Sequence, residues 1–192
     1  DALPIYDGSK VVGTQKIEIA SPITITSYNG SNLGIVIPEV LEYGNYGDYS
    51  VGERLNYGEK GIVTSIGFKA MYNKQLTSVV MPESVTQIGD SAFGSNQLIS
   101  IVIPKNVTSI GEYAFGYNQL ISAVIPPSVT SIGSDAFRGN QLTFVVIPES
   151  LTSIGDGAFG FNQLTSIVIP SMVTSIGSYA FTGNELTSVI IP

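Results

Sequence analysis

Apolar residues recur along this chain at a fixed spacing of 22 residues. Isoleucine followed by glycine starts at Ile66 and returns at every 22nd position as far as Ile176, while leucine repeats in the same frame from Leu76. A strict period without gaps predicts a solenoid, because one coil alone could not bury apolar columns that its neighbours can cover. The alanine column is Ala70, Ala92, Ala114, Ala136, Ala158 and Ala180, and the proline column is Pro82, Pro104, Pro126, Pro148, Pro170 and Pro192. The threonine column is Thr64, Thr86, Thr108, Thr130, Thr152 and Thr174, and the asparagine column is Asn96, Asn118, Asn140, Asn162 and Asn184.

Each coil contains two segments with the composition of β-strands. Residues 76–82 (LTSVVMP) are rich in β-branched side chains and end at proline, and residues 107–111 (VTSIG) end at glycine. Residues 90–96 (DSAFGSN) place an Ala-Phe pair between a capping residue and a Gly or Asn stop, which predicts one helical turn. We therefore expect coils of two strands in parallel sheets and one short helical turn.

The asparagine column lies at the turn into the first strand of each coil. A side-chain amide at this place can bond the backbone of its own coil and of the adjoining coil. We interpret the column as structural.

Residues 1–60 do not follow the period, and we expect a β-rich N-terminal cap there. Pro38 precedes Pro82 by 44 residues, which is twice the period, so one degenerate coil is expected over residues 39–60. Residues 42–61 are rich in Tyr and Gly, and we expect a loop there that covers the first coil or contributes to binding. The repeat array is expected over 61–192. It stops at Pro192 in mid-coil without a polar cap, which predicts either a truncated chain or self-association through this end.

Composition excludes several classes of function. The chain of 192 residues has 8 basic and 15 acidic residues, so its net charge of -7 argues against nucleic acid as a partner. It has no cysteine and no histidine, which excludes thiolate or imidazole metal sites and Ser-His-Asp triads. Asp90, Asp135 and Asp156 are expected at the starts of helical turns, where acids are favoured, and none has a plausible second catalytic group. We expect no enzyme, no cofactor and no metal.

No stretch reaches the roughly 20 apolar residues that a membrane-spanning helix needs, so we expect no membrane insertion. The first ten residues have neither a basic start nor an apolar run, so any signal peptide is expected to have been removed.

The repeated unit, quoted from one copy as NQLTSIVIPSMVTSIGSYAF (residues 162–181), resembles the BspA-like leucine-rich repeats of bacterial surface proteins, a class also described from treponemes. The match extends over residues 61–192, although the family's unit is usually slightly longer. The resemblance implies a curved solenoid, an exported protein at the cell surface or outside the cell, and a role in adhesion or in binding host or matrix proteins. A right-handed parallel β-helix is the alternative fold.

One column of the predicted sheet differs in a single copy. It reads Ser78, Ser100, Ser122, Phe144, Ser166 and Ser188. Serine's polarity predicts that this column faces outward, together with the valines two positions along, since alternate residues of a strand share a face. An exposed face of serine and valine is unusually apolar, and Phe144 is placed near its centre. The partner-binding candidates are Phe144, Ser122, Ser166, Val124, Val146 and Val168.

The sequence therefore predicts a non-catalytic binding module that recognises a protein or glycan through this face. The alternative is a structural spacer or self-assembling repeat domain that displays other domains. The regular β-branched columns can also be explained by strand pairing alone, and an ice-binding threonine ladder or an enzyme are weaker alternatives.

Overall fold

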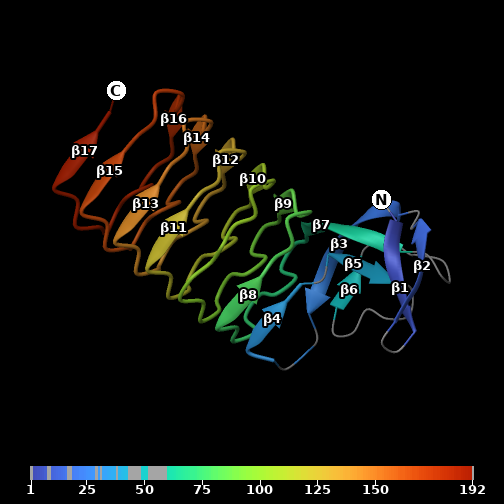
Figure 1. Ribbon diagram of the computed structural model, residues 1–192. Helices are drawn as coiled ribbons and strands as arrows, with labels where there is room; N and C mark the ends of the chain where they lie inside the picture. The colour runs from blue at the N-terminus through green and yellow to red at the C-terminus, as the bar shows by residue number, and fades with distance from the viewer. Residues whose placement is uncertain are drawn as a thin grey trace.

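The computed structural model describes residues 2–191 except 8–9, 17–18, 29, 31, 38, 43–48 and 52–59. The described residues contain seventeen strands, most of which form a solenoid whose coils stack along one axis, with the N-terminal strands at one end (Figure 1). The described residues contain no helix, and so none that could cross a membrane. The N-terminal strands are β1 (Ala2–Asp7), β2 (Lys10–Lys16), β3 (Ile19–Tyr28), β4 (Gly34–Val36), β5 (Val40–Glu42), β6 (Tyr49–Val51) and β7 (Lys60–Ile66).

The repeat array contributes two rows of strands. The first row, together with β4, forms one side of the solenoid and comprises β8 (Ser78–Val80), β11 (Ser122–Val124), β13 (Phe144–Val146), β15 (Ser166–Val168) and β17 (Ser188–Ile190). The second row comprises β9 (Gln87–Ile88), β10 (Ser109–Ile110), β12 (Ser131–Ile132), β14 (Ser153–Ile154) and β16 (Ser175–Ile176). The strands of the second row pair in parallel with partners one coil apart, such as Ser109 with Ser131, and β11 pairs with β13 in the same way in the first row. The prediction of stacked coils with parallel strands is confirmed.

The second row belongs to a continuous sheet, which we call the long sheet. Its strand order is β16-β14-β12-β10-β9-β7-β3-β6, and β5 also pairs with β7. The cap strands β5 and β6 run antiparallel to β7 and β3. Most of the predicted degenerate coil (39–60) and of the Tyr- and Gly-rich segment (42–61) lies outside the described residues. The separate hairpin of β1 and β2 is antiparallel.

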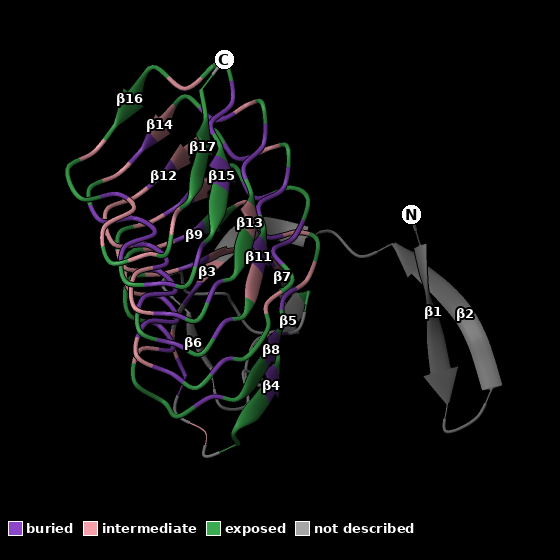
Figure 2. Cartoon of the chain, turned by 90° about the vertical axis from the view of Figure 1, so that its left-hand side faces the viewer, coloured by how far each residue is buried: buried purple, intermediate pink, exposed green. Residues whose placement is uncertain are grey.

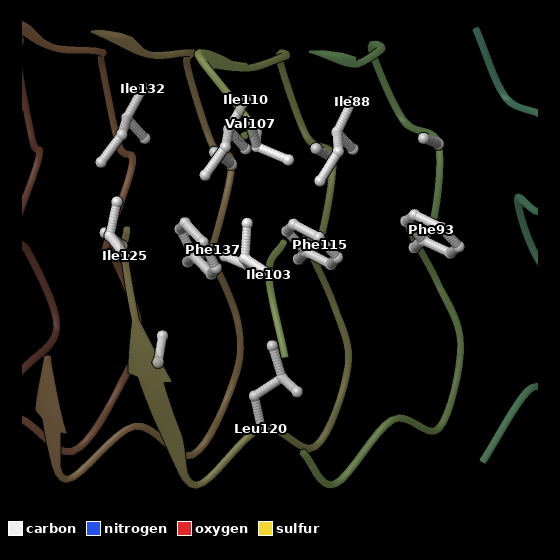
Figure 3. Close-up of a cluster of buried hydrophobic side chains, with 14 of the residues drawn as sticks. Ile88, Phe93, Ile103, Val107, Ile110, Phe115, Leu120, Ile125, Ile132 and Phe137 are labelled. Carbon is white, nitrogen blue, oxygen red and sulfur yellow. The ribbon is translucent and has the colours of Figure 1, made fainter. Parts of the chain in front are cut away.

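The core consists of the columns that the period predicted. The rings of Phe93, Phe115, Phe137 and Phe159 are fully buried, and successive rings stack with centroids 5.4 to 5.5 Å apart. Figure 3 shows three of these rings in a row, with Ile88, Ile110 and Ile132 in a second row beside them. Offset stacking of aromatic rings adds roughly 0.5–1.5 kcal/mol per pair to the free energy gained by burial. The stacked rings therefore stabilise an arrangement in which the coils are a constant distance apart.

The asparagine column joins each coil to the one before it. Asn118 is buried; its Oδ1 accepts a hydrogen bond from Leu98 N at 3.1 Å, and its Nδ2 donates to Phe93 O at 3.0 Å in the preceding coil. Its Nδ2 also donates to Phe115 O, within its own coil. Equivalent bonds are made by Asn96, Asn140 and Asn162. The interpretation of this column as structural is confirmed.

The predicted helical turn is wrong. An α-helix would direct each N–H to the carbonyl four residues earlier, but Ser91, Phe93 and Ser95 donate to carbonyls of the next coil at 2.7 to 2.8 Å. Ala92 N and Gly94 N close two tight turns onto the carbonyls three residues before them. The left-handed φ values of Ser91 (55°) and Ser95 (56°) turn the alternate N–H groups toward the neighbouring coil. Bonding between coils therefore replaces bonding within a helix.

Replacing Asn118 by alanine should lower the free energy of unfolding by about 2–4 kcal/mol, because each buried partner left without a hydrogen bond costs about 1–3 kcal/mol. Urea unfolding measures the change, and the exposed neighbour Gln119→Ala is the control, expected within about 0.5 kcal/mol of the parent. Equal stabilities of the two variants would contradict the structural role of the asparagine column.

The left-handed conformation of Ser91 costs a non-glycine residue about 1–2 kcal/mol, and glycine avoids this cost. Part of the gain is lost because glycine gives up more conformational entropy on folding. Ser91→Gly should therefore stabilise the protein by about 0.5–1 kcal/mol. The same column already holds Gly157, with φ of 60°. The reverse change, Gly157→Ser, should lower the melting temperature. If the segment were a helical turn, Ser91→Gly would be destabilising instead.

Candidate functional site

The outward side chains of β4, β8, β11, β13, β15 and β17, with residues 99–102, form a surface that we call the outer face. Figure 2 shows these strands in a row along one side of the solenoid, with their exposed positions in green. Successive residues of each strand alternate, as in Ser78 and Val80, which are exposed, and Val79, which is buried. The predicted direction of the serine and valine columns is therefore confirmed.

The structure brings the six candidate residues together on adjacent strands. Ser122 pairs with Phe144 and Val124 with Val146 across β11 and β13, and β15 carries Ser166 and Val168. The Phe144 side chain is 52% exposed, so the one large residue of the serine column points outward rather than into the core. Val124, Val146 and Val168 are also exposed, as is Ser166, whereas Ser122 is half-buried.

The outer face extends further than the sequence indicated. Ile99 and Ile121, which precede the serine column by one position, are about half exposed, and Val102 is 80% exposed. These residues continue the apolar surface from β13 toward β8. The isoleucines replace the threonines found in this column at Thr77 and Thr143, and this substitution is the signal in the sequence that could have identified them.

The strands of the outer face pair two by two rather than as one sheet. β4 pairs with β8, β11 with β13, and β15 with β17, while residues 100–102 form no strand. β13 and β15 are consecutive in the stack, yet no ladder joins them. We call the opening between β13 and β15 the seam.

Hydrogen bonds at both ends of the strands show where the seam opens. Within a pair, Thr187 N donates to Thr165 O at 2.9 Å and Ile169 N to Ile190 O at 2.9 Å. The equivalent bonds across the seam, from Thr165 N to Thr143 O and from Ile147 N to Val168 O, are not formed among the described residues. Beyond the strand the same two coils are joined again, because Gln163 N donates to Leu142 O at 2.9 Å.

The seam contains a hollow of about 320 Å³. Its lining is apolar apart from Ser166 and the backbone, and it comprises Phe144, Val145, Val146, Ile147, Ser166, Ile167 and Val168. Val145 is partly exposed, as is Ile101 in the same column, whereas Val79, Ala123 and Ile167 are buried. The opening thus uncovers part of the core, and Phe144 lies at its rim.

Charged groups are sparse around the seam. From residue 139 to the end of the sequence the charged residues are Glu149, Asp156 and Glu185, and there is no lysine or arginine. All three acids are exposed. Glu149 follows β13 after Ile147 and Pro148, so it places a negative charge at the edge of the outer face.

The acids that sequence analysis placed at helix starts bond to the next coil instead. Asp90 Oδ1 accepts a hydrogen bond from Glu112 N at 2.8 Å, and Asp156 Oδ1 accepts one from Ser178 N at 2.6 Å. Asp135 forms an ion pair with Arg138 at 3.1 Å. The Asp90 and Asp156 carboxylates thus link neighbouring coils, whereas Asp135 pairs within its own coil. In the described part of the chain no three acidic side chains gather as metal ligands would.

Aromatic residues also line the turn edge, on a different side from Phe144. The ring of Tyr113 stacks on Tyr117 at 5.4 Å, and burial raises the pKa of the Tyr113 phenol above its usual value. The Phe161 ring lies under the Arg138 guanidinium, 4.5 Å from its centroid. Tyr179 is largely exposed. The contacts of the first three rings are local packing within and between neighbouring coils.

Solved structures of bacterial leucine-rich repeat proteins have this fold. A leucine-rich cell surface protein from Faecalibacterium prausnitzii is 29% identical with a TM-score of 0.64, over 97% of this chain and 54% of that one. A leucine-rich repeat protein from Bacteroides ovatus is 26% identical with a TM-score of 0.60, over 83% of this chain and 46% of that one.

The pneumococcal vaccine antigen PcpA, at 21% identity, shares the fold, with a TM-score of 0.62 over 88% of this chain and 42% of that one. The chain thus spans about half the length of these structures or less. No curated protein matches it at a significant level.

A family profile also matches most of the repeat array. The BspA-type leucine-rich repeat region is found in six copies over residues 64–188, which is well over half of the chain. The matched range contains β8 to β16, which is the whole second row and the first row except β17. The chain therefore belongs to the BspA-type leucine-rich repeat family.

Proposed function

We propose that the chain is a non-catalytic binding module, adhesin-like and located at the bacterial surface or outside the cell, which recognises a protein or glycan through its outer face. The observation that carries the proposal is the contiguous apolar surface around Phe144. Three of its valines, Val124, Val146 and Val168, are each more than 50% exposed, and no charged side chain interrupts the strands that carry them. Exposed apolar surface of this kind is typical of interaction sites.

Phe144 has the properties of an anchor residue. Its ring is half exposed beside a hollow, whereas serine occupies the same column in the other five coils. Large aromatic side chains at the centre of an interface commonly contribute most of its binding free energy. The flanking serines and valines would complete the contact and exclude water.

The likeness to a cell surface protein from Faecalibacterium prausnitzii supports the location that we propose. In that setting host or extracellular-matrix proteins and glycans are accessible partners. The net charge of -7 disfavours nucleic acid.

A structural spacer is the second candidate function. The long sheet runs without interruption from β6 to β16, and such a ladder would give the array stiffness along its axis. A spacer makes no use of Phe144, so one substitution separates the two functions.

Phe144→Ser should weaken binding to a partner about 10- to 30-fold, because an anchor residue of this kind contributes about 1.4–2 kcal/mol to the binding free energy. Surface plasmon resonance against immobilised extracellular-matrix proteins and glycans measures the affinity. Serine is the common residue of this column, so the melting temperature should stay unchanged.

Phe161→Ser is the matched control, because Phe161 is also 52% exposed but lies on the turn edge. It should leave the affinity unchanged. If both variants bind as the parent does, the outer face is not the binding surface and the spacer function is favoured.

A further inference from the structure

We propose that the seam between β13 and β15 receives one or two large apolar side chains from an extended segment of a partner protein, and that basic residues flank this segment. The inference rests on the proposed function, since it names the partner of the outer face. Four properties of the seam lead to it: its volume, its apolar lining, its free backbone groups and the charge around it.

The volume of the hollow limits the size of the group that can enter the seam. A cavity of roughly 150 Å³ in another protein holds one benzene molecule, so the hollow of about 320 Å³ has room for one or two aromatic or large aliphatic side chains. A helix or a folded element is too large for it. The lining by Val145, Ile147 and Ile167 favours apolar groups over the hydroxyl-rich surface of a sugar.

The free backbone groups favour an extended segment. Thr165 N and Ile147 N lack the inter-coil acceptors that Thr187 N and Ile169 N have one coil further on. Unpaired N–H and C=O groups along a strand edge are a template for another strand, because its main chain offers complementary groups at the same spacing. A segment that inserts alternate side chains into the hollow would place its own N–H and C=O groups beside these edges.

The acidic residues near the seam favour basic residues on both sides of the partner's apolar segment. Glu149 lies just beyond β13, and Glu185 lies in the turn before β17, one coil from the seam. Residues 139–191 contain no basic side chain that would neutralise them. Lysine or arginine on either side of an apolar centre would therefore be attracted, mainly through a faster association rate that salt reduces.

A synthetic peptide, Lys-Lys-Val-Phe-Val-Phe-Val-Lys-Lys, is the probe for this inference. Titrated into the full 192-residue chain labelled with ¹⁵N, it should shift the backbone amide signals of Ile147 and Thr165 and those of β13 and β15. A peptide with the same centre and glutamate flanks, and one with lysine flanks and a Ser-Gly centre, should each bind at least about tenfold more weakly.

Ser166→Lys places a positive charge at the rim of the hollow, so it should weaken binding of the probe about tenfold or more. Ser78→Lys is the matched control, because Ser78 is the exposed equivalent on β8, three coils away from β13. It should change the affinity less than about twofold.

Two results obtained with a probe that binds would overturn the inference. One is equal weakening by Ser166→Lys and Ser78→Lys, and the other is amide shifts confined to residues away from β13 and β15. If the probe does not bind while Phe144→Ser weakens binding to a glycan or a matrix protein, the seam proposal fails and the proposed function stands. If Phe144→Ser has no effect on any partner, the proposed function fails.

Discussion

The whole structure depends on hydrogen bonds between neighbouring coils. A 22-residue coil with strands of two or three residues cannot satisfy most of its backbone polar groups internally, so most of them bond to an adjoining coil. The Asn118 amide illustrates the constraint, because it bonds the backbone of its own coil and of the preceding coil. The exact period of the apolar columns follows from this constraint, since an insertion would misalign every donor and acceptor beyond it.

Much of the fold could be predicted because the same constraint acts on the sequence. Burial of the Phe115 and Ile110 columns requires a constant spacing, and outward serine fixes the direction of each strand. The helical turn was wrong because an Ala-Phe pair between Ser91 and Gly94 satisfies local rules for a capped helix. Those rules do not take into account that the N–H groups of Ser91 and Phe93 have acceptors in the next coil.

The candidate site could be predicted only in part. The outward direction of Phe144 followed from the column in which it stands. The seam could not be predicted, because threonine stands at equivalent positions on both sides of it, at Thr143 and Thr165. Thr187 is the next threonine of this column, and it does form the inter-coil bond. Whether two strands pair depends on the relative placement of their backbones, and a periodic sequence contains little information about it. The departure of Phe144 from the serine column was the one local sign.

Under the proposed function, the two sides of the solenoid divide the tasks of stability and recognition. The long sheet, the Phe stack and the asparagine column hold the coils together continuously, so the outer face can leave backbone groups of β13 and β15 unpaired without loss of the fold. Native proteins usually protect free strand edges. An unprotected pair of edges, beside an exposed aromatic ring and a hollow, is what a peptide-binding surface requires.

Amide hydrogen exchange, followed by NMR on the free protein, tests the existence of the seam most directly. Exchange reports how well each N–H is hydrogen-bonded, and it can be compared between equivalent positions one coil apart. Thr165 N and Ile147 N should exchange at least about tenfold faster than Thr187 N and Ile169 N, because only the latter two donate to the adjoining coil. Equal protection of all four amides would mean that β13 and β15 are paired, and would contradict the account of an open seam.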